Sequence, residues 1–324
     1  MRTVHGRNKL GLVLTAGLVG ALTLGRVAAT QAADKPLLGL VSITATEDNN
    51  QRFIKAATAE AEKLGWQVSV IDAQGSADKA NAAIQNLVER KAAAIVDMVF
   101  PVTSVGAGVA AANAAHIPIG TWGGGMGPGI AAVNGSGGPM ATPIIEMLVK
   151  DMGGKGSLLE LTYHTGKVCR DREEVADGIL AKSPDIKITK NEVHIPGFFQ
   201  DGAQYATAWL ASHPAGSGPL AIWGCWDDPA LGAISALRQE ARTDVKVYGE
   251  NGNAQAIEAL QKKLMNGTAW QDSATEGVVM TDTLVEASKA GASWQPKSVE
   301  VPAVVVTQDN VAEFVKRQPE ALGK

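Results

Sequence analysis

Short apolar runs alternate with segments of helical spacing along most of the chain. The apolar runs predict buried strands at residues 37–43, 67–72, 93–98, 117–121, 158–161, 186–195, 220–224 and 245–248. Segments with apolar residues every three or four positions predict helices at residues 53–64, 79–90, 105–115, 174–182, 204–212, 231–240 and 255–264. A chain that alternates strand and helix in this way is expected to be α/β, with parallel sheets covered by helices on both faces.

Two glycine-rich segments, residues 123–129 and 135–138, interrupt this alternation and divide it into two blocks. Each block is long enough for a core of its own, since domains hold roughly 100–150 residues. We therefore predict two doubly wound parallel-sheet lobes joined by a multi-strand hinge. The N-terminal lobe is expected over residues 34–135 plus 272–298, and the C-terminal lobe over residues 136–271 plus 299–324. The late apolar segments, at residues 281–289 and 299–306, have to be shared between the lobes.

Residues 1–33 have the layout of a secretory signal peptide. Three cations precede an uncharged apolar stretch, Leu10–Leu24, and small residues follow it up to Ala33. The apolar stretch is short for a membrane span, and a retained membrane anchor is the alternative. Cleavage would remove four cations and no acids, so the formal net charge would change from −4 to −8. A mildly acidic chain argues against nucleic-acid binding, which needs clustered Lys and Arg.

In a doubly wound sheet, ligands bind at the loops that follow the carboxyl ends of the strands. Two facing lobes would bring both sets of loops to one cleft, a preferred place for a small-molecule site. A polar segment with Asn49 and Asn50 follows the first predicted strand, where Asp48, Asn49 or Asn50 also suits the cap of the next helix. Trp122 follows the fourth strand. Beside flexible glycines it offers a platform for a ring or an apolar ligand face, with packing at the lobe surface as the alternative.

The second block has further polar and aromatic residues after its strands. Arg170 and Arg172 cannot share one face of a helix, so we expect one of them to face the cleft and the other to face solvent. An inward arginine would donate to hydroxyl or carboxylate oxygens, and a surface arginine paired with a neighbouring acid is the alternative. Trp226 and Asp227 combine a stacking surface with a two-oxygen acceptor. Asp227 or Asp228 also fits a helix cap before the proline that follows.

The chain has two cysteines, Cys169 and Cys225. An exported protein can hold a disulfide, but one pair of cysteines in a sequence gives no geometry, so a disulfide and two buried thiols both stay open. Each cysteine lies within three residues of a candidate binding residue. A disulfide would therefore stiffen the loops of the second block that carry the candidate site.

The sequence contains no recognisable catalytic or metal-binding pattern. Its histidines lack the His-x-x-x-His spacing of a metal-binding helix, and its cysteines form no Cys-x-x-Cys pair. No serine lies in a nucleophile-elbow pattern, and residues 153–157 lack the spacing of a phosphate-binding loop. We therefore expect no catalytic residue, no metal and no cofactor, and a binding protein rather than an exported hydrolase.

Several stretches, in this order and spacing, resemble the sugar-type periplasmic solute-binding proteins of ABC importers, the group that includes ribose-binding protein. The strongest stretches are residues 57–65, 117–121, 227–237 and 247–252. The resemblance covers nearly the whole chain after the predicted signal peptide. It implies the type I periplasmic binding fold.

The resemblance also implies which residues contact the ligand. The family's ligand-binding positions fall at Arg172, Trp226, Asn251 and Gln271, with Asp227 beside Trp226 and with Phe198 or Phe199 near a further aromatic position. Elsewhere the chain departs from the family. An aromatic pair of the family falls at Asn49 and Asn50, and an Asp-Arg pair falls at Gly123 and Gly124. With fewer carboxylates to accept from hydroxyl groups, the site is expected to tolerate an anionic or less hydroxylated ligand better.

The resemblance implies the function of a substrate-binding component of an ABC importer in the periplasm. Such a protein would capture a monosaccharide, a polyol or a sugar-like compound in the inter-lobe cleft. It would deliver the ligand, as a monomer, to a permease and ATPase complex in the inner membrane, with no nucleic-acid partner. Two alternatives are the same fold with an anionic or aromatic non-sugar ligand, and a sensor that presents its ligand to a chemoreceptor or a kinase.

Overall fold

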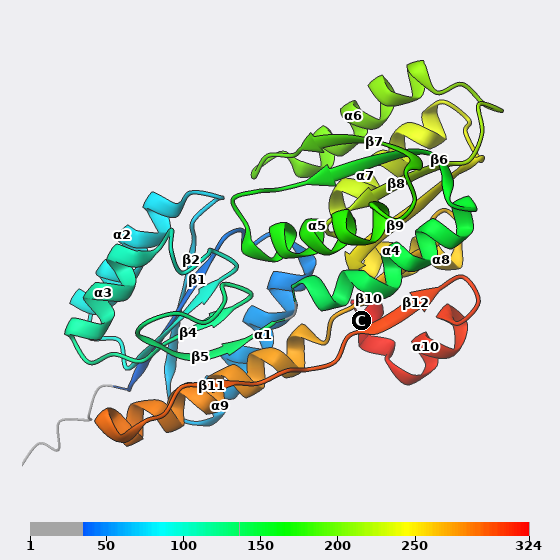
Figure 1. Cartoon of the computed structure of the whole chain (residues 1–324). Helices are drawn as coiled ribbons and strands as arrows, with labels where there is room; N and C mark the ends of the chain where they lie inside the picture. Colours follow the sequence, from blue (N-terminus) through cyan, green and yellow to red (C-terminus); the bar gives the residue numbers. More distant parts are fainter. Residues whose placement is uncertain (1–34, 136, 324) are drawn as a thin grey trace, which may run out of the picture. The chain divides into compact units, whose positions relative to one another are not determined.

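The computed structural model describes residues 35–135 and 137–323, so the predicted signal peptide and the alternative membrane anchor lie outside the described residues. The described part of the chain forms two sheets with helices packed on their faces (Figure 1). No helix in this part is long and apolar enough to cross a membrane. The two sheets and their flanking helices confirm the predicted α/β class.

The first sheet has the strand order β11-β5-β4-β3-β1-β2, and its neighbouring strands run parallel. Its strands are β1 (Leu37–Ser42), β2 (Gln67–Asp72), β3 (Ala94–Met98), β4 (Ile119–Trp122), β5 (Ile130–Asn134) and β11 (Lys297–Ser298). Its helices are α1 (Asp48–Lys63), α2 (Ala77–Glu89), α3 (Gly106–Ala114) and α9 (Ser273–Ala290). Successive side chains of a strand point to opposite faces, so Leu40 packs in one cluster with Phe53 of α1, while Val41 packs in another with Ile84 of α2.

The second sheet has the strand order β12-β10-β9-β8-β6-β7. Its strands are β6 (Lys155–Thr162), β7 (Asp185–Glu192), β8 (Leu220–Gly224), β9 (Val245–Asn251), β10 (Gly267–Trp270) and β12 (Val304–Thr307). Its helices are α4 (Gly138–Met152), α5 (Lys167–Leu180), α6 (Phe198–Ser212), α7 (Asp227–Gln239), α8 (Ala254–Gln261) and α10 (Val311–Arg317). The strands pair in parallel except that β12 is antiparallel to β10.

Late segments of the chain are shared between the two sheets, as the sequence predicts. Strand β10 belongs to the second sheet, whereas the helix α9 that follows it packs on the first. Strand β11 then joins the first sheet and β12 joins the second. We call the first sheet with its helices the first lobe, and the second sheet with its helices the second lobe. The residue ranges of the lobes given above stay a prediction.

The hydrophobic pattern does not predict β5, α4, β10 or α10. Strand β5 lies between Gly129 and Gly135, which extend the apparent loop on both sides. Helix α4 has Pro139 in its first turn and Pro143 inside it, and internal proline is a helix-breaking signal. Several predicted helices begin earlier than expected, and two of them thereby include candidate binding residues. Helix α1 begins at Asp48 instead of residue 53, and α5 at Lys167 instead of residue 174, so α1 includes Asn49 and Asn50, and α5 includes Arg172.

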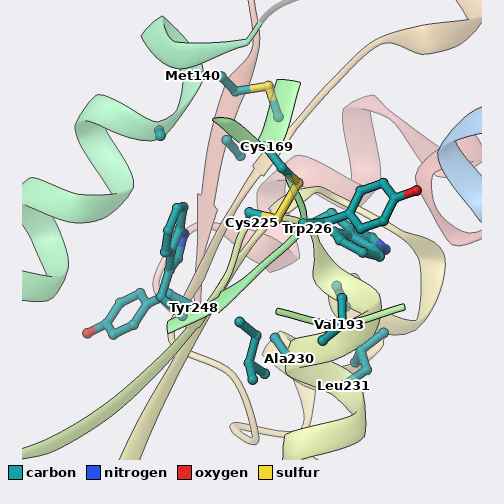
Figure 2. Packing of buried hydrophobic residues seen from close by; sticks show 14 of the residues in the cluster. Met140, Cys169, Val193, Cys225, Trp226, Ala230, Leu231 and Tyr248 are labelled. Carbon is teal, nitrogen blue, oxygen red and sulfur yellow. A yellow bond between two sulfur atoms is a disulfide. The ribbon is translucent and has the colours of Figure 1, made fainter. Parts of the chain in front are cut away.

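A disulfide joins Cys169 and Cys225, and this resolves the choice that the sequence leaves open. Cys169 lies in α5 and Cys225 follows β8, with their Cα atoms 5.3 Å apart. The bridge lies beside Trp226 among buried side chains (Figure 2). The two cysteines are 56 residues apart in the sequence. Closing a loop of this length in the unfolded chain is worth about 4 kcal/mol of stability in the chain-entropy treatment.

Asp97, in β3, is a carboxylic acid within the hydrophobic layer of the first lobe. Its side chain is fully buried, and neither oxygen has a hydrogen-bond partner among the described residues. Burial raises the pKa of Asp97 well above its ordinary value, because the ionised form loses its hydration without gaining a partner. With a raised folded-state pKa, the contribution of Asp97 to the free energy of unfolding is largest at low pH. It falls as the pH rises from the ordinary pKa of aspartate toward the raised one.

We expect Asp97→Asn to flatten the dependence of stability on pH, because asparagine has the same shape and does not ionise. As the pH rises from 4 to 8, the variant should become more stable than the wild type. The difference in the free energy of unfolding should grow by about 1.4 kcal/mol for each unit by which the pKa of Asp97 is raised within this range. Urea unfolding at the two pH values measures this difference. Asp185→Asn, at an exposed position, is the matched control. Identical pH profiles for Asp97→Asn and the wild type would show that Asp97 ionises freely.

Candidate functional site

A cavity lies between the first lobe and the second lobe. From the first lobe it is lined by Ile43, Thr44, Glu47, Asn49, Asn50, Val99, Trp122 and Gly123, and from the second lobe and its hinge crossing by Tyr163, Gly166, Val168, Cys169, Arg172, Ile195, Trp226, Asn251 and Gln271. Lining residues stand at or just after the carboxyl ends of strands of both sheets, where a doubly wound fold places its ligands.

The structure brings most of the predicted binding residues to this cavity. Those that line it are Asn49, Asn50, Trp122, Arg172, Trp226, Asn251 and Gln271. Their places in the cavity wall follow from the positions of the strand ends, which the sequence predicts well. Their role in binding stays a prediction. The two other predicted residues, Asp227 and Phe199, do not line the cavity.

Asp227 is held inside the second lobe by hydrogen bonds. Its carboxylate accepts from the backbone N–H of Asn253 at 2.7 Å and from the hydroxyl of Thr268 at 2.8 Å, and its side chain is fully buried. Burial raises the pKa of Asp227 to about 7, against these two hydrogen bonds. The residue therefore braces β10 and the start of α8, and the acceptor expected beside Trp226 does not reach the cavity.

Phe199 lies at the start of α6 with 37% of its surface exposed. Its neighbour Phe198 instead packs edge-on against Trp226, with ring centroids 5.6 Å apart. Of the two aromatic residues between which the sequence leaves a choice, Phe198 is therefore the one in contact with the cavity wall.

Arg172 is buried to 1% exposure in α5, although the sequence leads us to expect donors that face an open cleft. Its Nη1 donates to the carbonyl oxygen of Cys225 at 2.6 Å, and its Nη2 donates to Oδ1 of Asn251 at 3.0 Å. Arg170 is exposed and donates to the carbonyl oxygen of His164. The expectation that the two arginines face opposite ways is confirmed.

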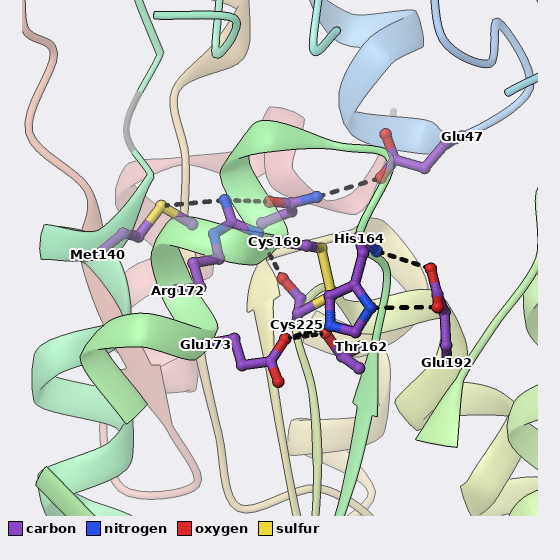
Figure 3. The surroundings of a disulfide bond; sticks show 10 residues. Glu47, Met140, Thr162, His164, Cys169, Arg172, Glu173, Glu192 and Cys225 are labelled. Atoms are coloured by element: carbon purple, nitrogen blue, oxygen red, sulfur yellow. Dashed lines mark hydrogen bonds and ion pairs between the residues drawn. A yellow bond between two sulfur atoms is a disulfide. The ribbon is translucent and has the colours of Figure 1, made fainter. Parts of the chain in front are cut away.

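A row of polar contacts connects the two lobes through Arg172 (Figure 3). The Sδ of Met140 lies 3.8 Å from Nη2 of Arg172 on one side, and Asn251 accepts from the same nitrogen on the other. The Nδ2 of Asn251 in turn donates to Oε1 of Glu47, in the first lobe, at 3.5 Å. Arg172 is thus connected to the first lobe by a single intervening side chain.

Glu47 caps α1, a role that the sequence assigns to Asp48, Asn49 or Asn50. Its Oε2 accepts from the backbone N–H of Asn50 at 2.8 Å. Short polar side chains dominate cap positions, and for that reason a glutamate just before them is easily missed. Its position after the first strand is the signal that could have identified it. The cavity therefore has a carboxyl group that the resemblance does not indicate.

A second polar group surrounds Gln271 at the hinge crossing. Its Oε1 accepts from Nδ2 of Asn49 at 3.1 Å, and its Nε2 donates to Oε2 of Glu276 at 2.8 Å. The indole Nε1 of Trp122 donates to the same oxygen of Glu276 at 2.6 Å. Burial raises the pKa of Glu276 to about 7, and these two hydrogen bonds oppose the rise. Glu276, absent from the predicted site, fixes two residues of the cavity wall from behind.

Aromatic side chains supply the apolar parts of the wall. Trp122 packs against Phe53, with ring centroids 4.8 Å apart. Trp226 has Tyr163 edge-on at 6.0 Å, in addition to Phe198. The indole Nε1 of Trp226 is buried and has no hydrogen-bond partner among residues 35–135 and 137–323. These contacts fix the orientation of both tryptophans.

Acidic groups surround Arg172, and of the four described below Glu47 is the one that lines the cavity. Burial lowers the pKa of the guanidinium, and Glu250, Asp227, Glu47 and Glu276 oppose that lowering. Burial also raises the pKa of Glu47, while the hydrogen bond from the backbone N–H of Asn50 opposes the rise. The buried acids therefore favour the charged form of Arg172.

The start of α1 also contacts the second lobe directly. The Oδ2 of Asp48 accepts from the backbone N–H of Ala254, the first residue of α8, at 3.1 Å. The Nη2 of Arg52 donates to the carbonyl oxygen of Asn251 at 2.9 Å. Gly123 lies opposite Val168 across the cavity, and a Cβ atom on it would lie 2.7 Å from Cγ1 of Val168. The lobes therefore meet closely on more than one side of the cavity.

Within the described ranges, no three His, Cys, Asp or Glu side chains are placed so that they could hold a metal ion. The polar side-chain groups of the residues that line the cavity are amides, hydroxyl groups, indole N–H groups, one carboxyl group and a guanidinium. Such groups bind through hydrogen bonds and charge.

We expect Arg172→Ala to lower the free energy of unfolding by about 3 kcal/mol or more. The variant leaves the acceptors on Cys225 and Asn251 without their donor, and it leaves buried acids without their counter-charge. Urea unfolding measures the loss. The control is Arg170→Ala in the same helix, which should change stability by no more than about 0.5 kcal/mol because the side chain is exposed. Equal losses in the two variants would contradict the structural role of Arg172.

Comparison with known proteins agrees with this architecture. The periplasmic binding protein domain family matches residues 38–292. A ribose import binding protein of Salmonella typhimurium is 28% identical over 300 residues, which cover 86% of this chain and 95% of that protein. A xylitol-binding protein of Mycolicibacterium smegmatis is 27% identical over 336 residues, which cover 94% of this chain and 87% of that protein.

The fold is also found in a solved ABC transporter solute-binding protein from Agrobacterium vitis. Its TM-score to this chain is 0.80 at 24% sequence identity, with 88% of this chain and 99% of that chain covered. The predicted type I periplasmic binding fold is thereby confirmed. Together with the match over residues 38–292, this likeness establishes that the chain belongs to the family of periplasmic binding proteins.

Proposed function

We propose that this protein is the substrate-binding component of an ABC importer in the periplasm, and that it captures a small, neutral, polyhydroxylated compound. A monosaccharide, a polyol or a sugar-like compound fits this description. The signal peptide predicted at residues 1–33 would direct the export. The names of its relatives support the proposal, since one is a ribose import binding protein and another is a xylitol-binding protein.

The observation that carries the proposal is the mixture of donors and acceptors along the cavity. Asn49, Asn50, Asn251 and Gln271 bring amide donors and acceptors to the wall, between a carboxyl group and a guanidinium. Most of these amides are hydrogen-bonded to neighbouring residues, and a ligand hydroxyl group can exchange with such a partner. A hydroxyl group donates and accepts at once, so a ligand with several hydroxyl groups matches such a wall. The unpartnered N–H of Trp226 leaves one further donor for a ligand oxygen, in the described part of the chain.

The charges favour a neutral ligand over an anion. Among the described residues that line the cavity, the side chains with a formal charge are Glu47 and Arg172. Two nitrogens of Arg172 already donate to Cys225 and Asn251, so an anion would have to compete with these acceptors. It would also meet Glu47 and, behind the wall, Glu276. A neutral ligand avoids both costs.

The mechanism we propose is capture and release without chemical change of the ligand. The lobes close over the ligand about the segments that cross between the sheets, and the closed protein, as a monomer, docks on a permease and ATPase complex in the inner membrane. The relatives' names favour this importer role over the presentation of a ligand to a chemoreceptor or a kinase.

We expect D-ribose or xylitol to raise the melting temperature of the protein, because a ligand that binds only the folded state stabilises it by about 2.7 kcal/mol at a concentration of 100 Kd. D-Ribonate, the anionic counterpart of ribose, should bind more weakly than the neutral compound. Thermal unfolding and titration calorimetry measure both effects. A ribonate affinity above that of every neutral compound tested would overturn the assignment of a neutral ligand.

We expect Trp226→Ala to weaken binding of the responding compound by about 1–3 kcal/mol, by analogy with the stacking of bases on aromatic side chains. Phe199→Ala is the matched control, because this aromatic side chain lies on the same lobe but does not line the cavity. Titration calorimetry gives the two affinities. The placement of the site would be wrong if Phe199→Ala reduced the affinity and Trp226→Ala did not.

A further inference from the structure

The disulfide between Cys169 and Cys225 is part of the cavity wall. Cys169 lines the cavity directly, and Cys225 precedes Trp226, which also lines it. Both cysteines are buried, at 3% and 0% exposure. The bridge ties the beginning of α5, which carries Arg172, to the loop between β8 and α7, which carries Trp226.

The same two segments are also joined by a hydrogen bond. The carbonyl oxygen of Cys225 accepts from Nη1 of Arg172 at 2.6 Å (Figure 3). Arg172 lies three residues after Cys169 in α5, so the covalent link and the hydrogen bond bring one helical turn and one loop together at adjacent points. A shift of the loop would therefore move an acceptor of Arg172 together with the indole of Trp226.

Side-chain caps do not contribute to fixing these two segments. Gly166, which precedes α5, has no side chain that could cap the helix, and the side chain of Trp226, which precedes α7, makes no capping hydrogen bond within the described structure. Caps normally set the entry of a helix and contribute about 1 kcal/mol. The bridge thus restrains two helix starts that lack a side-chain cap, on the side of each helix that meets the cavity.

We propose that the Cys169–Cys225 disulfide positions Arg172 and Trp226 for the ligand, so that tight binding depends on oxidation. This inference rests on the proposed function. In thiol–disulfide exchange, the two thiols would lose two electrons and two protons to a disulfide of a partner oxidoreductase, which leaves as a dithiol. The periplasm supports this reaction and the cytoplasm opposes it. Ligand binding would therefore be gained after export, and the reduced precursor would leave cytoplasmic ligand free.

The test compares the oxidised wild type with the double variant Cys169→Ala, Cys225→Ala. D-Ribose and xylitol are the titration probes, at a temperature where each protein is folded. We expect the double variant to bind the responding probe about tenfold more weakly or worse, because its binding groups are no longer pre-positioned. Wild type that is refolded in excess dithiothreitol should show the same loss, and this arm decides the outcome if the double variant does not fold.

A matched control separates positioning from stability. Ile84→Ala removes buried apolar volume from α2 in the first lobe, away from the cavity, and lowers stability by an amount comparable to the loss of a disulfide. It should keep the wild-type affinity. If Ile84→Ala and the double variant lost affinity equally, the disulfide would act only through the stability of the protein, and the proposal would be wrong.

Hydrogen exchange of the ligand-free protein tests the positioning without any ligand. Reduction should speed amide exchange in residues 166–172 and 224–228 more than elsewhere in the second lobe. If neither probe binds the oxidised protein, the proposed ligand class fails, and the exchange pattern alone then decides the inference. Unchanged exchange in these two segments, or unchanged affinity after reduction, would overturn it.

Discussion

A guanidinium group that is buried away from water needs acceptors and opposite charge from the protein itself. This constraint at Arg172 fixes the positions of the segments around it. Its acceptors come from the loop after β8 and from the end of β9, so the positions of these segments depend on one another. Asn251 then extends the same contacts to Glu47 at the cap of α1. The first lobe therefore completes an environment that begins within the second lobe.

The polar interior of this molecule is costly for folding. Glu250 and Glu276 are carboxyl groups with no exposed surface, and burial raises the pKa of each. Apolar residues of similar size would make a more stable core. These acids balance Arg172, and Glu276 also orients Trp122 and Gln271. Stability supplied elsewhere, by the sheets and by the Cys169–Cys225 bridge, offsets this cost.

The fold can be predicted from the sequence, and so can the presence of seven of the nine candidate residues in the cavity wall, because both depend on local pattern. Apolar alternation marks strands such as β1 and β8, and the doubly wound plan then indicates where their loops meet. The failures have long-range causes. Asp227 is turned inward by Asn253 and Thr268, partners 26 and 41 residues away along the chain. The sequence does not identify Glu47 because its role as a cap depends on the folded turn before α1. It does not predict β5 or α4 because the glycines beside β5 and the prolines in α4 are typical of loops.

The glycines after β4 lie where their neighbours leave no room for a side chain. The resemblance described above implies an Asp-Arg pair of the related family at the positions of Gly123 and Gly124. In this protein neighbouring atoms occupy the space that a side chain at Gly124 would need. A Cβ there would lie 2.5 Å from the carbonyl oxygen of Phe100 and 2.8 Å from Oδ2 of Asp97. A Cβ on Gly123 would collide with Val168. No single substitution can restore that pair, so placing side chains at these two positions, in evolution or by design, requires concerted replacements of their neighbours.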